Sequence, residues 1–281
     1  MYKLICVAND QVLAGSGLHA EHGVAFWIEN PEGVVLFDTS NSQDVLRFNM
    51  DKLGLQNEKI NAVALSHGHY DHTGGLMALT SGKTKSTLPI HAHPSIFDER
   101  LTRKAGNVKR VSSPFSREAA LSSFDIHLSD QPVEILGGLW TSGEIVDRSE
   151  LEGRGASHSI RNGDTYVPDP YKDDISLVMK TKNGIALICG CCHAGLLNTL
   201  FHVRNHFPEP IHTIVGGTHL ISASGGDLRY IIKVLSAEFG DVSYYLNHCT
   251  GGTAIKALAE NFGSRVHPFP ANAAVEFDCA S

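Results

Sequence analysis

The sequence predicts an α/β fold in which two sheets pack between helices. Three observations support this prediction. The first third of the 281-residue chain alternates short β-rich runs with helical patterns, and the last third repeats that alternation. Hydrophobic residues make up 42% of the chain and charged residues 19%, which is enough apolar material for a large core. A chain of this size commonly forms one domain, so we expect a single domain spanning residues 1–281.

In the first third, runs rich in β-forming residues and broken by Gly, Pro or Asn predict strands at 3–7, 24–29, 34–38, 61–66 and 89–93. The apolar spacing of residues 42–53 predicts a helix that ends at Gly54. Residues 74–79 resemble the start of a second helix.

The middle of the chain, from about residue 94 to 174, has a less regular pattern. We expect an inserted loop or cap region here that forms a substrate entrance, because functional residues concentrate on long loops. Residues 150–174 look loop-like. The basic residues between positions 100 and 110 predict a solvated loop or helix face.

In the last third, strands are predicted at 175–180 and 185–189, joined by a hairpin turn at Asn183-Gly184. Further strands are predicted at 211–215, 242–246 and 275–277. Helical spacing covers residues 196–206, 228–239 and 253–262, and Gly240 and Gly263 end the last two.

The composition argues against some classes of binding partner. A net charge of −7 argues against a nucleic-acid surface, which usually needs a clustered basic face. No apolar run is long enough to span a membrane, and the opening residues do not have the pattern expected of a signal peptide. The six cysteines lack the density of a disulfide scaffold. We therefore expect a cytoplasmic protein with reduced thiols and a small-molecule substrate.

Histidine is enriched, with sixteen in the chain, and three of them cluster with one aspartate in six residues. His67, His69, Asp71 and His72 follow a predicted buried strand and precede Gly74-Gly75. Imidazole and carboxylate groups together suit Zn, Mn, Fe or Ni. We expect one or two divalent transition metal ions, zinc above the others. His67 and His69 would serve one ion, and Asp71 and His72 a second.

The pattern His67-x-His69-x-Asp71-His72 resembles the signature of the metallo-β-lactamase-fold superfamily. The resemblance implies a four-layer αβ/βα sandwich with the metals at one edge. Further segments are similar to one branch, the metal-dependent hydrolases related to dihydropterin–ribofuranosylaminobenzene phosphate synthase. These segments are residues 21–23, 36–39, 66–76, 190–195, 216–220 and 248–251.

The resemblance also implies roles for residues outside the motif. Asp38 matches an acidic residue that braces the metal-binding loop, and His248 matches the last histidine ligand of the second ion. The loop that usually carries a third histidine, residues 170–174, has none. His193 is the simplest replacement, and Cys191 or Asp174 could also approach the metals. The alternative for Cys191 is a small buried residue with no part in the site.

Two more histidines are candidates. His219 follows a predicted strand and could be a general acid, a metal ligand, an anion-binding group or a support for the site; we assign it a catalytic role with Asp71. His22 lies on an early loop and is expected in the substrate pocket. The other histidines are expected at the surface or as satisfied core residues: His19, His91, His93, His127, His158, His202, His206, His212 and His267.

These features predict a hydrolase that uses a metal-activated hydroxide, foremost on a phosphate ester or phosphodiester. Asp71 would both ligate a metal and orient the nucleophile. Alternatives are a lactone or thioester hydrolase, a pterin-linked phosphoribosyl transferase, and a metal-binding sensor or effector with little turnover. A di-iron redox centre is a further alternative, although such relatives usually carry a flavin domain for which this chain has no room.

Overall fold

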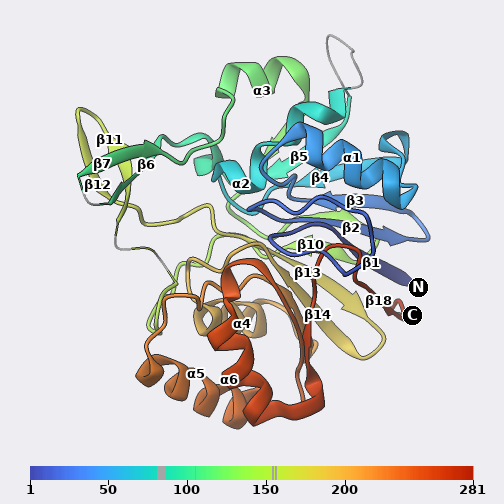
Figure 1. Cartoon of the computed structure of the whole chain (residues 1–281), viewed down its shortest axis with the longest axis vertical. Helices are drawn as coiled ribbons and strands as arrows, with labels where there is room; N and C mark the ends of the chain where they lie inside the picture. Colours follow the sequence, from blue (N-terminus) through green and yellow to red (C-terminus); the bar gives the residue numbers. More distant parts are fainter. Residues whose placement is uncertain (81–86, 105, 154, 156, 281) are drawn as a thin grey trace.

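The computed structural model describes residues 1–80, 87–104, 106–153, 155 and 157–280. These residues form a four-layer αβ/βα sandwich, as the resemblance implied (Figure 1). Two seven-stranded sheets lie face to face in the described part of the chain, and helices cover their outer faces.

The first sheet has the strand order β18-β1-β2-β3-β4-β5-β8. Strands β3, β4, β5 and β8 run parallel, so their carboxyl ends lie at one edge. The strands are β1 (Tyr2–Ala8), β2 (Ala25–Asn30), β3 (Gly33–Phe37), β4 (Ile60–Ala64), β5 (Pro89–Ala92), β8 (Asp125–Leu128) and β18 (Ala274–Phe277).

The second sheet has the order β17-β16-β15-β14-β13-β10-β9. Strands β14 to β17 are parallel to one another, while β13 pairs antiparallel with β14 across the predicted turn. The strands are β9 (Glu134–Leu136), β10 (Leu139–Thr141), β13 (Ser176–Thr181), β14 (Gly184–Cys189), β15 (Ile211–Gly216), β16 (Ser243–Leu246) and β17 (Val266–Pro268).

The helices divide between the two outer faces (Figure 1). On the first sheet lie α1 (Gln43–Leu53), α2 (Tyr70–Thr73) and α3 (Arg117–Ser123). On the second lie α4 (Leu196–His206), α5 (Gly225–Glu238) and α6 (Gly252–Phe262). The Ser42 side chain caps α1 and Gly54 ends it in a left-handed conformation, as its position predicted.

Three apolar clusters separate the four layers. One lies between α1 and the first sheet, one between the two sheets, and one between the second sheet and α4 to α6. Representative buried side chains are, in that order, Leu36, Leu46 and Met50; Phe26, Phe37, Leu177 and Ile188; and Leu187, Leu200, Leu235 and Leu258.

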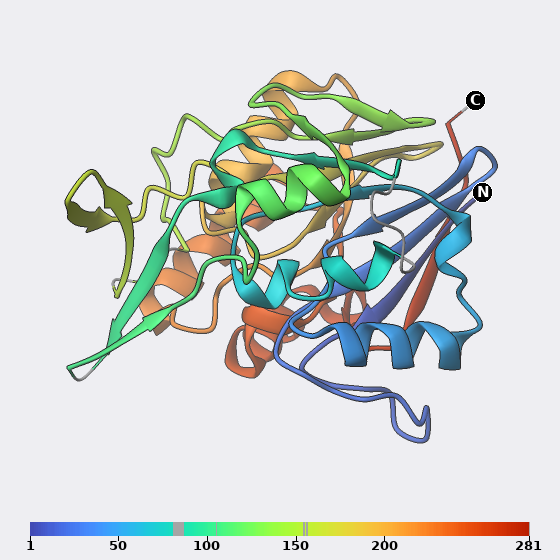
Figure 2. The same cartoon turned by 90° about the horizontal axis from the view of Figure 1, so that it is seen from above.

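The middle of the chain is more regular than expected. Strands β8, β9 and β10 extend the two main sheets, and a smaller four-stranded sheet has the order β12-β11-β6-β7. Its strands are β6 (Arg100–Lys104), β7 (Asn107–Arg110), β11 (His158–Asn162) and β12 (Thr165–Pro168). This small sheet projects from the sandwich (Figures 1 and 2).

Three local expectations were wrong. Residues 150–174 are not all loop, because β11 and β12 form a hairpin whose turn, Asn162-Gly163, is a signal the sequence carried. The basic residues lie on β6 and β7, which pair antiparallel. The segment 74–79 gives no α-helix: α2 ends at Thr73 and a 3₁₀ turn follows at Leu76–Thr80.

In the described residues, no helix is long and apolar enough to cross a membrane.

Candidate metal centre

The chain reversals after the parallel strands bring the candidate residues together. Residues 66–72 follow β4, residues 190–195 follow β14, and residues 247–251 follow β16. Because the carboxyl ends of parallel strands meet at one edge of a sheet, these loops meet at one edge of the sandwich.

Glycine is required where the histidine motif turns back against the first sheet. A Cβ on Gly74 would lie 1.9 Å from the carbonyl oxygen of Asn41, and one on Gly75 would lie 2.1 Å from that of Thr39. Only a residue without a side chain permits this approach. The Gly-Gly pair therefore sets the position of the short helix α2, which carries Asp71 and His72.

Asp38 lies behind the metal-binding loop. Its fully buried carboxylate accepts hydrogen bonds from the backbone N–H of Ser66 at 2.7 Å and from the Ser66 hydroxyl at 2.7 Å. It lies 2.6 Å from Nδ1 of His72. The carboxylate thus fixes the start of the loop and directs the other nitrogen of His72 toward the site interior.

His67, His69 and His193 form one cluster of potential ligands. Their ligand atoms lie within 4.8 Å of one another, and Nε2 of His67 is 3.0 Å from Nδ1 of His69. Burial, reinforced by neighbouring positive groups, lowers the pKa of all three imidazoles well below the usual value. Nε2 of His69 and both ring nitrogens of His193 have no hydrogen-bond partner among the described residues. Neutral, buried nitrogens with free lone pairs fit a transition-metal ion.

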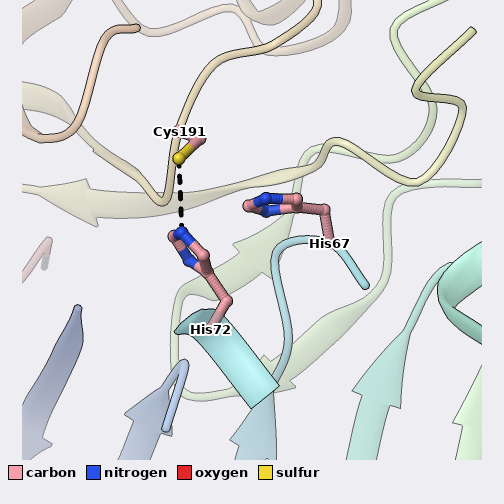
Figure 3. A group of neighbouring side chains, drawn as sticks. All are labelled: His67, His72 and Cys191. Carbon is pink, nitrogen blue, oxygen red and sulfur yellow. Dashed lines mark hydrogen bonds between the residues drawn. The ribbon is translucent and has the colours of Figure 1, made fainter. Parts of the chain in front are cut away.

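Cys191 joins this cluster to the next. Figure 3 shows its thiol above His72, with Sγ 3.2 Å from Nε2, and the ring of His67 beside them. Ligand atoms of these three residues lie within 4.8 Å of one another. Cys249, which sequence reasoning did not single out, makes a similar group with Cys191 and His248. Two thiols therefore face the candidate metal centre.

Asp71, His72 and His248 form the second cluster. Oδ2 of Asp71 lies 3.8 Å from Nε2 of His72 and 3.6 Å from Nε2 of His248. Burial alone would lower the pKa of His248, but Cys249, Asp10 and Asp71 raise it to about 9. His248 adopts a positive φ of 47°, an uncommon conformation that directs its ring into the cluster.

His219 and Asp174 lie around His193. The ring of His219 is 4.2 Å from that of His193, and its buried Nδ1 has no partner among the described residues. The Asp174 carboxylate accepts the backbone N–H of Ala194 at 2.8 Å, so it stabilises the loop that carries His193.

His158 was expected at the surface or in the core, but it lies beside the candidate metal centre. Its Nδ1 is hydrogen-bonded to the hydroxyl of Tyr171, and its ring lies 5.2 Å from that of His69. Tyr171 in turn stacks on His193, with ring centroids 4.1 Å apart and planes 11° apart. The small sheet brings His158 to the site, and the local sequence carried no signal for this.

The expectation of a solvated side chain at Arg100 was also wrong, because this side chain is fully buried. Its Nε lies 2.8 Å from Asp169 and its Nη2 lies 2.6 Å from Asp173. The other oxygen of Asp173 accepts the backbone N–H of Gly68 at 2.7 Å. This ion-pair network therefore holds the backbone between His67 and His69.

A pocket of about 230 Å³ opens above the two clusters. Its wall includes one cationic side chain, Lys109 of the small sheet, together with further imidazoles. The residues that line it include His22, His69, Asp71, Lys109, His158 and His219. His22 therefore lies at the pocket, next to Asp71.

The fold is an αβ/βα sandwich with groups of residues that could hold a metal ion gathered at one edge. The family model of the metallo-beta-lactamase superfamily matches residues 20–144. An uncharacterized protein of Methanocaldococcus jannaschii is 30% identical over 86% of this chain and 88% of its own length. The chain belongs to the metallo-beta-lactamase superfamily.

Two other similarities extend over almost the whole chain. The 7,8-dihydropterin-6-methyl-4-(beta-D-ribofuranosyl)-aminobenzene-5'-phosphate synthase of Methanocaldococcus jannaschii is 28% identical over 92% of this chain and 91% of its own length. A crystal structure of a metal-dependent hydrolase of the beta-lactamase superfamily superimposes with a TM-score of 0.85 and 25% identity, covering 99% of this chain and 100% of that one.

Proposed function

We propose that this protein is a metal-dependent hydrolase of phosphate esters or phosphodiesters with one or two divalent ions. The observation that carries the proposal is the set of neutral, partnerless imidazole nitrogens at the floor of an open pocket. Bound ions would lower the pKa of a coordinated water toward neutrality and polarise a substrate oxygen.

The residues divide into two ligand sets and their supports. His67, His69 and His193 would hold the first ion, and Asp71, His72 and His248 the second. Asp38 would keep the ring of His72 in its ligating orientation, a role that such carboxylates commonly have at metal sites.

Two residues would contribute to the reaction itself. The free oxygen of Asp71 would orient the attacking nucleophile. His219, on the pocket wall beside His193, would donate a proton to the leaving group.

The donor set favours zinc as the metal. Imidazole suits Zn, Fe, Ni and Cu, whereas Mn and Mg prefer oxygen ligands. The thiols of Cys191 and Cys249 beside the imidazoles favour a softer ion further.

The pocket supports a small, anionic substrate. Its volume of about 230 Å³ lies below the roughly 300–1,000 Å³ of pockets for drug-sized ligands, which favours a substrate with a small reacting group, and Lys109 places a positive charge at the wall. Similarity to a synthase whose name includes a ribofuranosyl phosphate product favours a second candidate, pterin-linked phosphoribosyl transfer. Both candidates require recognition of phosphate.

The test is the double substitution His67→Ala with His69→Ala. We expect the first ion, measured by elemental analysis of protein purified without added metal, and turnover to be lost together. The matched control is His91→Ala with His127→Ala, because these two rings stack on each other at 5.1 Å on the first sheet. This control should retain both properties.

A substrate screen separates the alternatives. It would include a phosphomonoester, a phosphodiester, a lactone, a thioester and a pterin with a phosphoribosyl donor. Full turnover by the double variant would refute the hydrolase proposal. Slow turnover of every substrate by the native protein, with tight binding of one, would identify a sensor instead.

A further inference from the structure

Three imidazole nitrogens converge on a single oxygen of Asp71. Besides the distances to His72 and His248 given above, Nε2 of His22 lies 3.2 Å from Oδ2 of Asp71. His22 belongs to the segment between β1 and β2, far in sequence from the other two residues. Nitrogens from three separate segments therefore surround one carboxylate oxygen at 3.2, 3.6 and 3.8 Å.

The opposite nitrogen of each ring is held by a carboxylate. Nδ1 of His22 lies 2.7 Å from Oδ1 of Asp10, and Nδ1 of His248 lies 2.5 Å from Oδ2 of the same residue. Asp38 has the same relation to His72. Histidines that bind metals commonly donate their second ring N–H to a carboxylate in this way.

This arrangement turns Nε2 of each ring toward Asp71. Each Nε2 faces the negative oxygen of Asp71, so the space between them suits a positive charge: a proton on Nε2 in the metal-free site, or a metal ion that takes its place. The spacing fits such a cation. Two ligands at about 2.0–2.1 Å from a tetrahedral zinc ion lie about 3.3 Å apart, close to the distances observed here.

We propose that His22 is a ligand of the second ion, with Asp71, His72 and His248, and that Asp10 is the positioning residue for His22 and His248. The inference rests on the metal site of the proposed function and completes its second ligand set. The side chain of His22 is 57% exposed, so packing alone does not fix its ring. Asp10 supplies the orientation, since one carboxylate contacts both rings.

The test is titration of metal-free protein with Co²⁺, followed by visible absorption and by elemental analysis of the loaded protein. We expect two ions in the native protein. His22→Gln should keep the first ion and weaken the second by more than the roughly 10–100-fold typical of an outer partner, whereas Asp10→Asn should fall within that range. The control is His19→Gln, because His19 lies three residues earlier and stacks on Phe48.

Each outcome decides the proposal. Binding of the second Co²⁺ by His22→Gln with native affinity and spectrum would overturn it, even if KM for a substrate increased. A native protein that binds a single ion would overturn it too. Loss of the second ion in His22→Gln supports it, and absence of hydrolysis by a native protein with two ions would refute only the proposed function.

Discussion

Asp38→Asn tests how the metal centre is held. The substitution keeps the shape of the side chain but removes its charge and replaces one acceptor oxygen with an NH₂ donor. The Asp38 carboxylate accepts two hydrogen bonds from Ser66 and lies 2.6 Å from Nδ1 of His72. All three side chains are fully buried. Asn can satisfy only part of this set, so the ring of His72 loses its charged partner.

The magnitude follows from these contacts. Loss of an outer carboxylate partner typically weakens metal binding about 10–100-fold, which is about 1.4–2.8 kcal/mol. We expect that increase in the Kd of the second ion. Because a hydrogen bond to a charged group contributes about 1.5–3 kcal/mol, the metal-free variant should lose a comparable free energy of unfolding.

Competition with a chromophoric chelator measures the first quantity and urea unfolding of metal-free protein the second. The control is Asp227→Asn in the first turn of helix α5, where only the capping box with Ser224 is altered. That variant should lose about 1 kcal/mol or less of its free energy of unfolding, and its metal affinity should not change. Native metal affinity in Asp38→Asn would refute the bracing role.

Three further predictions concern pH, a buried charge and a close backbone contact. His248 has a pKa raised to about 9, and it must lose its proton before it can bind a metal. The affinity for the second ion should therefore rise about tenfold for each pH unit between about pH 6 and pH 8, which metal titrations at several pH values will measure. Arg100→Met leaves Asp173 buried without its partner and should cost about 3–5 kcal/mol in urea unfolding. Gly74→Ala should cost about 1–3 kcal/mol or more in the same assay, because its Cβ would clash with backbone.

Each of these predictions has an internal comparison. Affinity for the first ion should change little over the same pH range, because burial keeps its imidazoles neutral, and equal slopes for both ions would contradict the assignment. If Arg100→Met unfolded at the same urea concentration as the native protein, the ion pairs of Arg100 would not support the metal-binding loop. Gly225→Ala is the control for Gly74→Ala, since its added Cβ would meet only a flexible arginine end at 3.5 Å.

Much of the fold was predictable because its signals are local. The predicted hairpin at Asn183-Gly184 and the helix over residues 196–206 match β13–β14 and α4. Alternation and turn residues act over a few positions, so they can be recognised without knowing the rest of the chain. The small sheet was missed because its strands are short and its central pairing, β6 with β11, joins residues 56 to 60 positions apart.

The sequence by itself determined the cluster His67, His69, Asp71 and His72, because residues this close on one strand end must lie together. Only the tertiary structure decided which distant groups complete it. Asp10, His158 and Cys249 reach the site from separate segments, and Arg100 supports it from a hairpin that looked solvated. The physical reason is that parallel strands place the loops after them at one edge, and strand order is a property of the whole sheet.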